Sequence, residues 1–369
     1  MNFYNLASIL FLILYAVHVP AQDLPDEFDE IYRSYEEAFN NNDLEVAQTL
    51  AKQAMNMAVT SIGEDHDKSA ILMINLGHVL VLSGKSDEAE SYLSRAEEII
   101  VGKFGTNHES LITVHEDLAA IYANKGDVEN TRHKLIKAIN LRKLRWGEDD
   151  PKIINLLRSQ AQIDVAANKL DSAGDLLIQA IGIVEKNYGA TDPTATAIII
   201  SLGDIAFNKN DFTDAENLYQ QALKLFEEKL DEDDPRIVSL HAKLAEFYIT
   251  QQNDKYSDHA DKVIALIKTE ETAAQPLFII KPLLPGIDAE QLQGTILFEF
   301  NVTNTGKVTN PKIIESEPVN TFDQATLEAV SKWRFLPKYE NGSRVDQPGT
   351  RARITILENS VQVYFGDNG

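Results

Sequence analysis

The chain repeats itself every 42 residues over most of its length, and this repeat restricts the fold more than any other feature. A short polar turn begins at five positions 42 residues apart: Gly63, Gly105, Gly147, Gly189 and Asp231. Small residues recur with the same period at Ala47, Ala89, Thr131, Ala173, Ala215 and Ser257. Small side chains at fixed positions let neighbouring helices approach closely. Independent markers with one period indicate a tandem structural repeat.

Within each repeat the apolar residues have helical spacing. One stripe contains Leu72, Leu76, Val79 and Leu80, and the next contains Leu93, Ala96 and Ile99. This spacing predicts a helix, a tight turn, a second helix and a longer turn in every unit. Helix pairs stacked at a constant period form an α-solenoid with a continuous core. We predict six helix pairs within residues 22–268.

The turns between repeats follow the pattern Gly-x-x-His/Asp, and three of them continue with Pro151, Pro193 and Pro235. Together with the period and the small residues, this pattern resembles tetratricopeptide repeats, specifically the 42-residue, kinesin-light-chain-like variety. The resemblance implies a concave surface that binds proteins or peptides.

The turn residues have two possible roles. His66 and His108, each followed by an acidic residue, could be metal ligands. Their equivalents Asp150, Asp192 and Asp234 lie where a side chain caps the next helix. Because a 42-residue period spreads these groups along the solenoid, we predict helix caps, no metal and no cofactor. No Ser/His/Asp grouping or phosphate loop is found at a meaningful spacing, so we predict that the protein is not an enzyme.

The N-terminus predicts export. Residues 6–19 form an apolar run, and Val19-Pro20-Ala21 offers a cleavage site before Gln22. These features predict a signal peptide over residues 1–21 and a periplasmic protein that contacts membranes only through partners. The alternative is an uncleaved inner-membrane anchor, because no Lys or Arg precedes the run. Its 14 residues are fewer than the roughly 20 that span a bilayer.

The charge distribution separates two regions. The net charge is −23, and the segment from Glu290 contains 10 of the 57 acidic residues and 8 of the 34 basic ones, a balance of −2. The preceding part therefore contributes −21. A strongly acidic surface repels phosphate, so nucleic acid is not expected as a partner. The absence of cysteine excludes disulfides. The oligomeric state is not predicted.

The 42-residue period stops after Lys268. Residues 269–293 contain three prolines and are predicted to be a linker. Residues 294–302 alternate apolar and polar side chains, which predicts a strand, and Gly306 follows in a turn. Residues 308–316 form a second predicted strand, in which Pro311 indicates a bulge or an edge position.

A helix and a third strand complete this C-terminal region. Thr321-x-x-Gln324 has the form of a capping box that opens a helix, with Trp333 at the end of its buried stripe and Pro337 stopping it. Residues 351–357 are predicted to be the last clear strand. The order strand, strand, helix, strand predicts a small α+β domain over residues 294–369.

This region closely resembles the C-terminal domain of TonB proteins. The resemblance is carried by the alternating strand from Gly294, by Gly306, and above all by the element Trp333-Arg334-Phe335-x-Pro337. In that family the domain is periplasmic and pairs with a short extended segment of outer-membrane transporters by strand addition. Trp333, Arg334, Phe335, Pro337 and Gly306 then serve as the domain signature and core.

Carried over to this chain, the resemblance implies that residues 351–357 offer the partner-binding edge. Arg351, Arg353 and Thr355 are then the candidates that contact a partner, and the two arginines suit an acidic segment. The alternative is that the arginines protect an exposed edge against aggregation.

The two modules together predict a non-enzymatic periplasmic scaffold or adaptor of a TonB-type transport system, with transporter segments and TonB-system components as partners. Two alternatives are an atypical TonB energy transducer with an uncleaved N-terminal helix, and a general tetratricopeptide-repeat interaction protein. Energy-transmitting TonB proteins have an N-terminal transmembrane helix and a long Pro-rich spacer. Here helix pairs occupy the place of that spacer.

Overall fold

The structure is a computed structural model that describes residues 24–267, 273–282, 293–357 and 360–366. The chain divides into two compact units between Leu218 and Tyr219. The predicted signal peptide lies outside the described residues. Within the described part, no helix has both the length and the apolar character that a membrane span requires.

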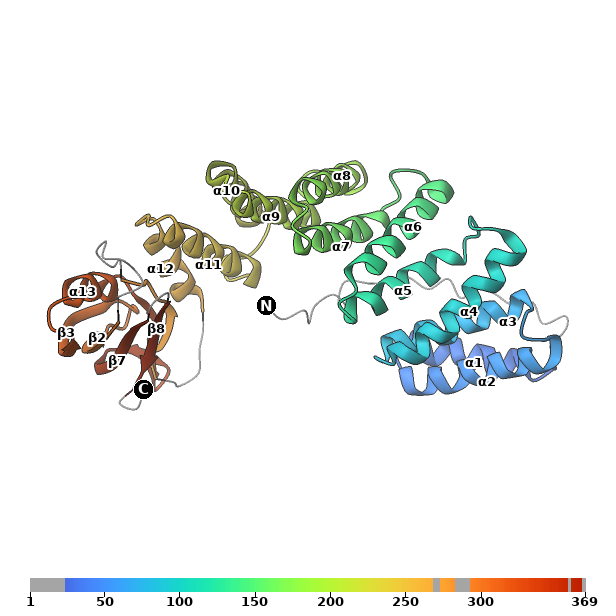
Figure 1. Cartoon of the computed structure of the whole chain (residues 1–369), viewed down its shortest axis with the longest axis horizontal. Helices are drawn as coiled ribbons and strands as arrows, with labels where there is room; N and C mark the ends of the chain where they lie inside the picture. Colours follow the sequence, from blue (N-terminus) through green and yellow to red (C-terminus); the bar gives the residue numbers. More distant parts are fainter. Residues whose placement is uncertain (1–23, 268–272, 283–292, 358–359, 367–369) are drawn as a thin grey trace. The chain divides into compact units, whose positions relative to one another are not determined.

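The first unit consists of antiparallel helices in consecutive pairs (Figure 1). They are α1 (Phe28–Asn40), α2 (Leu44–Ile62), α3 (Asp67–Leu82), α4 (Ser86–Phe104), α5 (Leu111–Asn124), α6 (Val128–Trp146), α7 (Ile153–Ala166), α8 (Leu170–Tyr188) and α9 (Pro193–Asn208). The boundary between the units falls within α10 (Phe212–Glu227). The second helices of successive pairs begin at residues 44, 86, 128, 170 and 212, so each starts 42 residues after the last. The predicted solenoid of helix pairs is confirmed.

The repeated small residues are buried in the helical core. Ala47, Ala89 and Ala173 are fully buried, and Thr131 is nearly so. A larger side chain at these positions would push the neighbouring helix away. The period in the sequence is therefore the packing period of the core.

The residues between repeats cap the following helices. The His66 Nδ1 accepts a hydrogen bond from the backbone N–H of Lys68 at 3.2 Å, as the N-cap of α3. Equivalent bonds run to Asp192 from the N–H of Thr194 and to Asp234 from the N–H of Arg236, at 2.8 and 2.9 Å. These contacts confirm the predicted caps at residues 66, 192 and 234. At the turns of His108 and Asp150 the prediction is wrong, because α5 and α7 begin two residues later, after Ser110 and Lys152, and have no side-chain cap.

Buried charges also join the helices of the first unit. His78 Nδ1 lies 2.9 Å from Asp117 Oδ1 and links α3 to α5, and Arg142 Nε donates to Glu116 Oε1 at 2.7 Å and links α6 to α5. Burial disfavours the charged imidazole, but the carboxylate of Asp117 outweighs it and raises the pKa of His78. The sequence does not indicate these pairs, because they interrupt an otherwise apolar packing pattern.

The second unit contains α11 (Pro235–Thr250), α12 (Tyr256–Leu266) and a small β-rich domain. Its main sheet is antiparallel with the order β3-β2-β7-β8, formed by β2 (Gly294–Val302), β3 (Val308–Glu317), β7 (Gln347–Leu357) and β8 (Ser360–Phe365). Two short ladders join β1 (Gln275–Phe278) to β4 (Arg334–Leu336) and β5 (Lys338–Glu340) to β6 (Ser343–Val345). The helix α13 (Asp323–Ser331) lies beside β3 (Figure 1). Strands β1 to β8 and α13 are called the C-terminal domain below.

The alternation predicted for residues 294–302 places one side of β2 in the core. Ile296, Phe298, Phe300 and Val302 are at most 1% exposed, and they share a cluster with Trp333. The predicted fold class, a solenoid of helix pairs followed by a small α+β domain, is confirmed.

Several local predictions differ from the structure. The capping box at Thr321 and Gln324 is absent, since the N-cap of α13 is Phe322 and no side chain caps the helix. The helix ends at Ser331, so Trp333 lies beyond it instead of on its stripe. The predicted linker contains β1, which completes a ladder with β4.

Candidate protein-binding site

The order of the sheet corrects the predicted binding edge. The strand β7, which contains Arg351, Arg353 and Thr355, pairs with β2 on one side and with β8 on the other. The prediction that residues 351–357 form the edge is therefore wrong, because six residues near the C-terminus form another strand outside β7. Among the described strands, β8 and β3 are the edges of this sheet.

The three predicted contact residues lie on the open face of the sheet. Arg351 Nε donates to Glu299 Oε2 at 3.1 Å, and Lys312 Nζ lies 2.8 Å from Glu299 Oε1. Hydrogen bonds from Lys312 and from Arg351 lower the pKa of Glu299. Arg351 is thus engaged within the sheet and does not extend toward solvent as an isolated cation.

Arg353 lies between two cross-strand neighbours on the same face. Its partner on β2 is Leu297 and its partner on β8 is Tyr364. Its Nε atom is shielded from solvent and has no hydrogen-bond partner in the described part of the chain. A buried donor without an acceptor is unfavourable. A turn of the Arg353 side chain toward a bound partner would let an acceptor of that partner satisfy it.

The hydrogen-bond pattern of the β7–β8 ladder shows which backbone groups face the open edge. The N–H of Gly366 donates to the carbonyl of Arg351 at 3.0 Å, and in an antiparallel ladder bonded and non-bonded pairs alternate. By this alternation, Gln362 and Tyr364 direct their backbone groups toward β7. Val361, Val363 and Phe365 direct theirs away from the sheet, where an added strand would pair.

A surface hollow lies at the Phe365 end of this edge. Its volume is about 520 Å³, and its lining includes Pro276, Phe335, Arg351 and Phe365. Apolar rings therefore line a space next to the edge, and the Arg351–Glu299 ion pair forms part of its polar side. A side chain from a strand added to β8 could enter it.

The opposite edge strand, β3, has different chemistry. It contains Pro311, and Asn310 adopts a positive φ of 51° where the register with β2 shifts. This geometry confirms the predicted bulge at an edge. Charged residues Lys312, Glu315 and Glu317 follow along the strand. Proline, a bulge and charges are the features that keep an edge from pairing with another chain.

The signature residues form the support of the sheet. Trp333 is fully buried, its Nε1 donates to the carbonyl of Ile280 at 2.7 Å, and its ring packs against Phe298 and Phe300. Phe335 is 1% exposed. Both aromatic residues lie in the core, although Phe335 also lines the hollow beside β8, and Pro337 is buried between β4 and β5.

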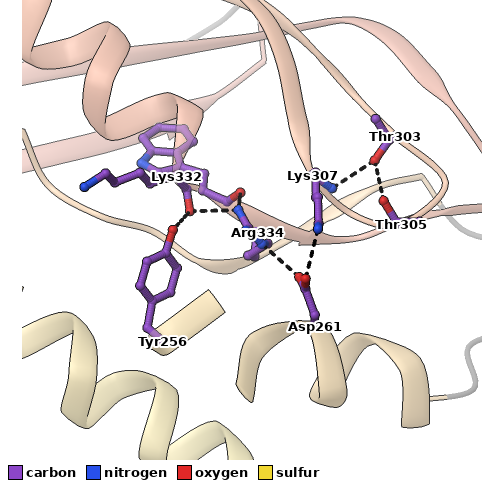
Figure 2. Close-up of polar contacts among 8 residues, drawn as sticks. Tyr256, Asp261, Thr303, Thr305, Lys307, Lys332 and Arg334 are labelled. Carbon is purple, nitrogen blue, oxygen red and sulfur yellow. Dashed lines mark hydrogen bonds and ion pairs between the residues drawn. The ribbon is translucent and has the colours of Figure 1, made fainter. Parts of the chain in front are cut away.

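Gly306 has the positive φ that its predicted turn requires, but Gly306 and Arg334 also make contacts that the sequence did not indicate. Arg334 Nε donates to Asp261 Oδ1 of α12 at 3.0 Å (Figure 2). Gly306 has a φ of +76°, and a Cβ atom there would lie 2.0 Å from the carbonyl oxygen of Phe335. No sequence signal connects Asp261 with this domain, because 73 residues separate it from Arg334.

The first unit has a repeated aromatic feature of its own. Phe104, Trp146 and Tyr188 end α4, α6 and α8, and they are 49%, 51% and 57% exposed. They occupy equivalent positions 42 residues apart. Three half-exposed rings at the repeat distance offer apolar contacts to a protein partner.

Comparisons with known proteins agree with this architecture. The family model for the Gram-negative bacterial TonB protein C-terminal matches residues 288–355. Two tetratricopeptide-repeat models match residues 38–100 and 196–236. The chain thus contains tetratricopeptide repeats and a TonB-type C-terminal domain, as both resemblances predicted.

Curated relatives match over a limited region. Protein TonB of Pseudomonas aeruginosa is 30% identical over 85 residues, which are 23% of this chain and 25% of that protein. Protein TonB of Klebsiella pneumoniae is 30% identical over 78 residues, 21% of this chain and 29% of that protein. The chain therefore spans only about a quarter of the length of these relatives.

Solved structures resemble the helical part. Nearly identical TPR-like repeats of a kinesin light chain from Podosopora anserina have a TM-score of 0.47 at 19% identity, covering 55% of this chain and 96% of that one. A tetratricopeptide repeat protein from Parabacteroides merdae also has a TM-score of 0.47, at 17% identity, covering 66% and 82%.

Proposed function

We propose that this chain, which joins tetratricopeptide repeats to a TonB-type C-terminal domain, is a non-enzymatic periplasmic scaffold of a TonB-type outer-membrane transport system. Its C-terminal domain would bind an extended transporter segment by strand addition, and the repeats would hold a second protein. The observation that carries the proposal is the open β8 edge, on a domain that matches a family of envelope proteins.

The chemistry of β8 supports strand addition. Its sequence is Ser-Val-Gln-Val-Tyr-Phe, which has no charge, no proline and a high content of β-branched and aromatic residues. The backbone groups of Val361, Val363 and Phe365 face outward and can pair with a partner strand. Their side chains lie opposite Ile356, Ile354 and Ala352, on the core side.

The neighbouring groups indicate what kind of segment would bind. On the core side, Val361 and Val363 are partly buried against the apolar cluster, so the partner strand should place apolar residues there. On the open face, Arg353 has a shielded donor without an acceptor. The segment should therefore alternate apolar residues with polar ones, with a carboxylate or amide oxygen near Arg353.

Site-specific photo-crosslinking in cells tests this proposal. A photoreactive amino acid would replace Tyr364 on β8 in one variant and Ile314 on β3 in the matched control, since both side chains are about 40% exposed. The Tyr364 variant is expected to crosslink TonB-dependent outer-membrane transporters, and the Ile314 control is not. If transporters crosslink from neither position, or equally from both, the β8 assignment is wrong.

The location of the protein is tested separately. Fractionation followed by N-terminal sequencing should give a soluble periplasmic protein that begins near Gln22. A protein that retains residues 1–21 in the inner membrane would instead support the anchored energy transducer.

A further inference from the structure

The helix α12 and the C-terminal domain share a polar network within the second unit (Figure 2). Asp261, on α12, accepts from Arg334 Nε at 3.0 Å, and Lys307 Nζ lies 3.0 Å from its other carboxylate oxygen. Arg334 is in β4, and Lys307 follows the turn between β2 and β3. One carboxylate therefore connects two separate parts of the domain to the helix.

Further contacts fix the same junction. The hydroxyl of Tyr256, in the first turn of α12, donates to the carbonyl of Lys332 at 2.8 Å. The Arg334 guanidinium lies over the Tyr256 ring, 5.7 Å from its centroid. The side chain of Arg334 is 10% exposed and that of Asp261 is 37% exposed, so Arg334 is largely removed from water. An arginine in this environment needs an anionic partner.

The C-terminal end of α12 is closed by the same domain. The last carbonyl groups of a helix have no partner within the helix. Arg344, in β6, donates to the carbonyl oxygens of Ile264 and Ile267 at 2.6 and 3.2 Å. A cation at this end also interacts favourably with the helix dipole. The domain thus supplies the cap that the helix lacks in its own sequence.

The turn between β2 and β3 is shaped to fit the helix. The side chain of Thr303 accepts from the N–H of Lys307 at 3.0 Å and bonds to Thr305 at 2.9 Å (Figure 2). The Ile264 side chain lies 3.0 Å from the position that a Cβ atom on Gly306 would take. A side chain at Gly306 would therefore meet the helix as well as the backbone of Phe335. Polar and apolar contacts both hold this turn against α12.

We infer that α11, α12 and the C-terminal domain form one rigid module, and that Lys307, Arg334 and Arg344 make a docking surface whose occupant is the chain's own α12. The domain closes the last helix pair in place of a terminal capping helix, which repeat proteins require. The docking residues lie in the β2–β3 turn, β4 and β6, so β8 is left available. The module holds the β8 edge in a fixed orientation to α11 and α12. This inference does not depend on the identity of the partner.

The functional module begins well before the region of the family match. The TonB-type family match starts at residue 288, whereas the compact unit starts at Tyr219. A fragment cut at the family boundary would expose Arg334 without its anion. The remaining N-terminal part would keep α12 but lose Arg344, which caps the C-terminal end of that helix.

Distance measurements on the full chain test the inference, and the absence of cysteine makes specific spin labelling straightforward. Labels would be attached through K262C on α12 and E340C at the end of β5, both exposed. Pulsed electron–electron resonance should give one narrow distance peak. The charge reversal D261K should abolish the narrow peak, because it places a third cation beside Lys307 and Arg334.

Two variants serve as controls. D258K makes the same change at an exposed position of α12 and should keep the narrow peak. The double variant D261K/K307E places an anion between two cations again and should restore the peak. A broad distribution in the parent chain, or a narrow one in D261K, would overturn the inference. A double variant that stays broad would overturn the role of Asp261 as the connecting residue.

Discussion

The two edge strands of one sheet, β3 and β8, have opposite chemistry. The β3 edge has Pro311, a bulge at Asn310 and three charged residues, whereas β8 has six uncharged residues without proline. An edge without protection is a risk for aggregation, so its presence requires a reason. Because the same domain protects one edge and leaves the other open, we interpret β8 as the side that pairs with another chain.

The largest predicted effect is a loss of stability when Trp333, in the apolar cluster beneath the sheet, is truncated. The ring of Trp333 contacts Phe298 and Phe300 in β2 and Phe365 in β8, and it is fully buried. The substitution Trp333→Ala should lower the free energy of unfolding of the C-terminal domain by about 3–5 kcal/mol. Chemical denaturation followed by circular dichroism measures this change.

A matched control for this prediction is Ile314→Ala on β3, where the side chain is 40% exposed. Its effect should stay within about 0.5 kcal/mol, as for most surface positions. If Trp333→Ala were as mild as this control, Trp333 would not be a main support of the sheet.

The next prediction separates the two edges directly. The N–H of Val363 faces away from β7, so Val363→Pro removes a donor from the open edge without breaking a bond inside the sheet. Binding of a synthetic peptide with the sequence of the crosslinked transporter segment should weaken by about tenfold, since one hydrogen bond contributes about 0.5–1.5 kcal/mol and the ring also obstructs the partner strand. Isothermal titration calorimetry measures the affinity.

Val363→Thr is the control, because threonine keeps both the N–H and the branched shape of the side chain. Its affinity for the peptide should match that of the parent chain. Equal affinity in the proline variant would show that the partner does not pair with β8. The difference between β3 and β8 would then have no role in partner binding.

The sequence predicted the solenoid well because its packing is local and periodic. The positions of Ala47, Ala89 and Ala173 in the core follow from the 42-residue period alone. The caps at His66, Asp192 and Asp234 follow from their place before a helix. Each of these predictions depends either on the repeat period or on residues a few positions apart.

The binding edge was predicted less well because it depends on pairing between distant segments. An alternating strand at residues 351–357 is visible in the sequence, but whether it lies inside or outside the sheet depends on β8. The short run Ser360–Phe365 has no marker that distinguishes an edge strand from an extension. Contacts such as Asp261 with Arg334 join residues 73 positions apart and leave no local pattern.

A smaller effect is expected on the open face next to β8. The Arg353 Nε has no acceptor in the described structure, whereas Arg351 bonds to Glu299. Arg353→Gln should therefore weaken binding of the same peptide by about fivefold, or about 1 kcal/mol, which is below the full value of a charged hydrogen bond because the face is partly solvated. Lys312→Gln on β3, which changes the other cation paired with Glu299, is the control and should have little effect. If the two variants are equivalent, Arg353 has no special role in recognition.

The smallest predicted effect concerns the stability of the helix pair α11 and α12 near neutral pH. We expect no change at the two edges of the sheet. His241 Nδ1 and His259 Nδ1 lie 2.8 Å apart between α11 and α12. Burial lowers the pKa of both imidazoles, and together with the charge of His241 it lowers that of His259 to about 4. Lys262 also lowers the pKa of His241, while Asp258 and Glu227 partly oppose the shift at His259. At pH 7 both rings are neutral, and one can donate to the other.

The direction of the pH dependence follows from these values. An unfolded histidine gains its proton near pH 6.5, whereas folded His259 resists protonation down to about pH 4. The stability of the helix pair should be constant above about pH 6.5 and fall as the pH decreases through this interval. Scanning calorimetry should show a lower Tm at pH 5 than at pH 7.5, and His259→Gln should reduce that difference. Peptide binding at β8 should be the same at pH 7.5 and at pH 5, where the stability of the helix pair has begun to fall, since no histidine lies in the β7–β8 ladder. A loss of binding at pH 5 that His259→Gln removes would instead show that the edge depends on the charge state of the helix pair.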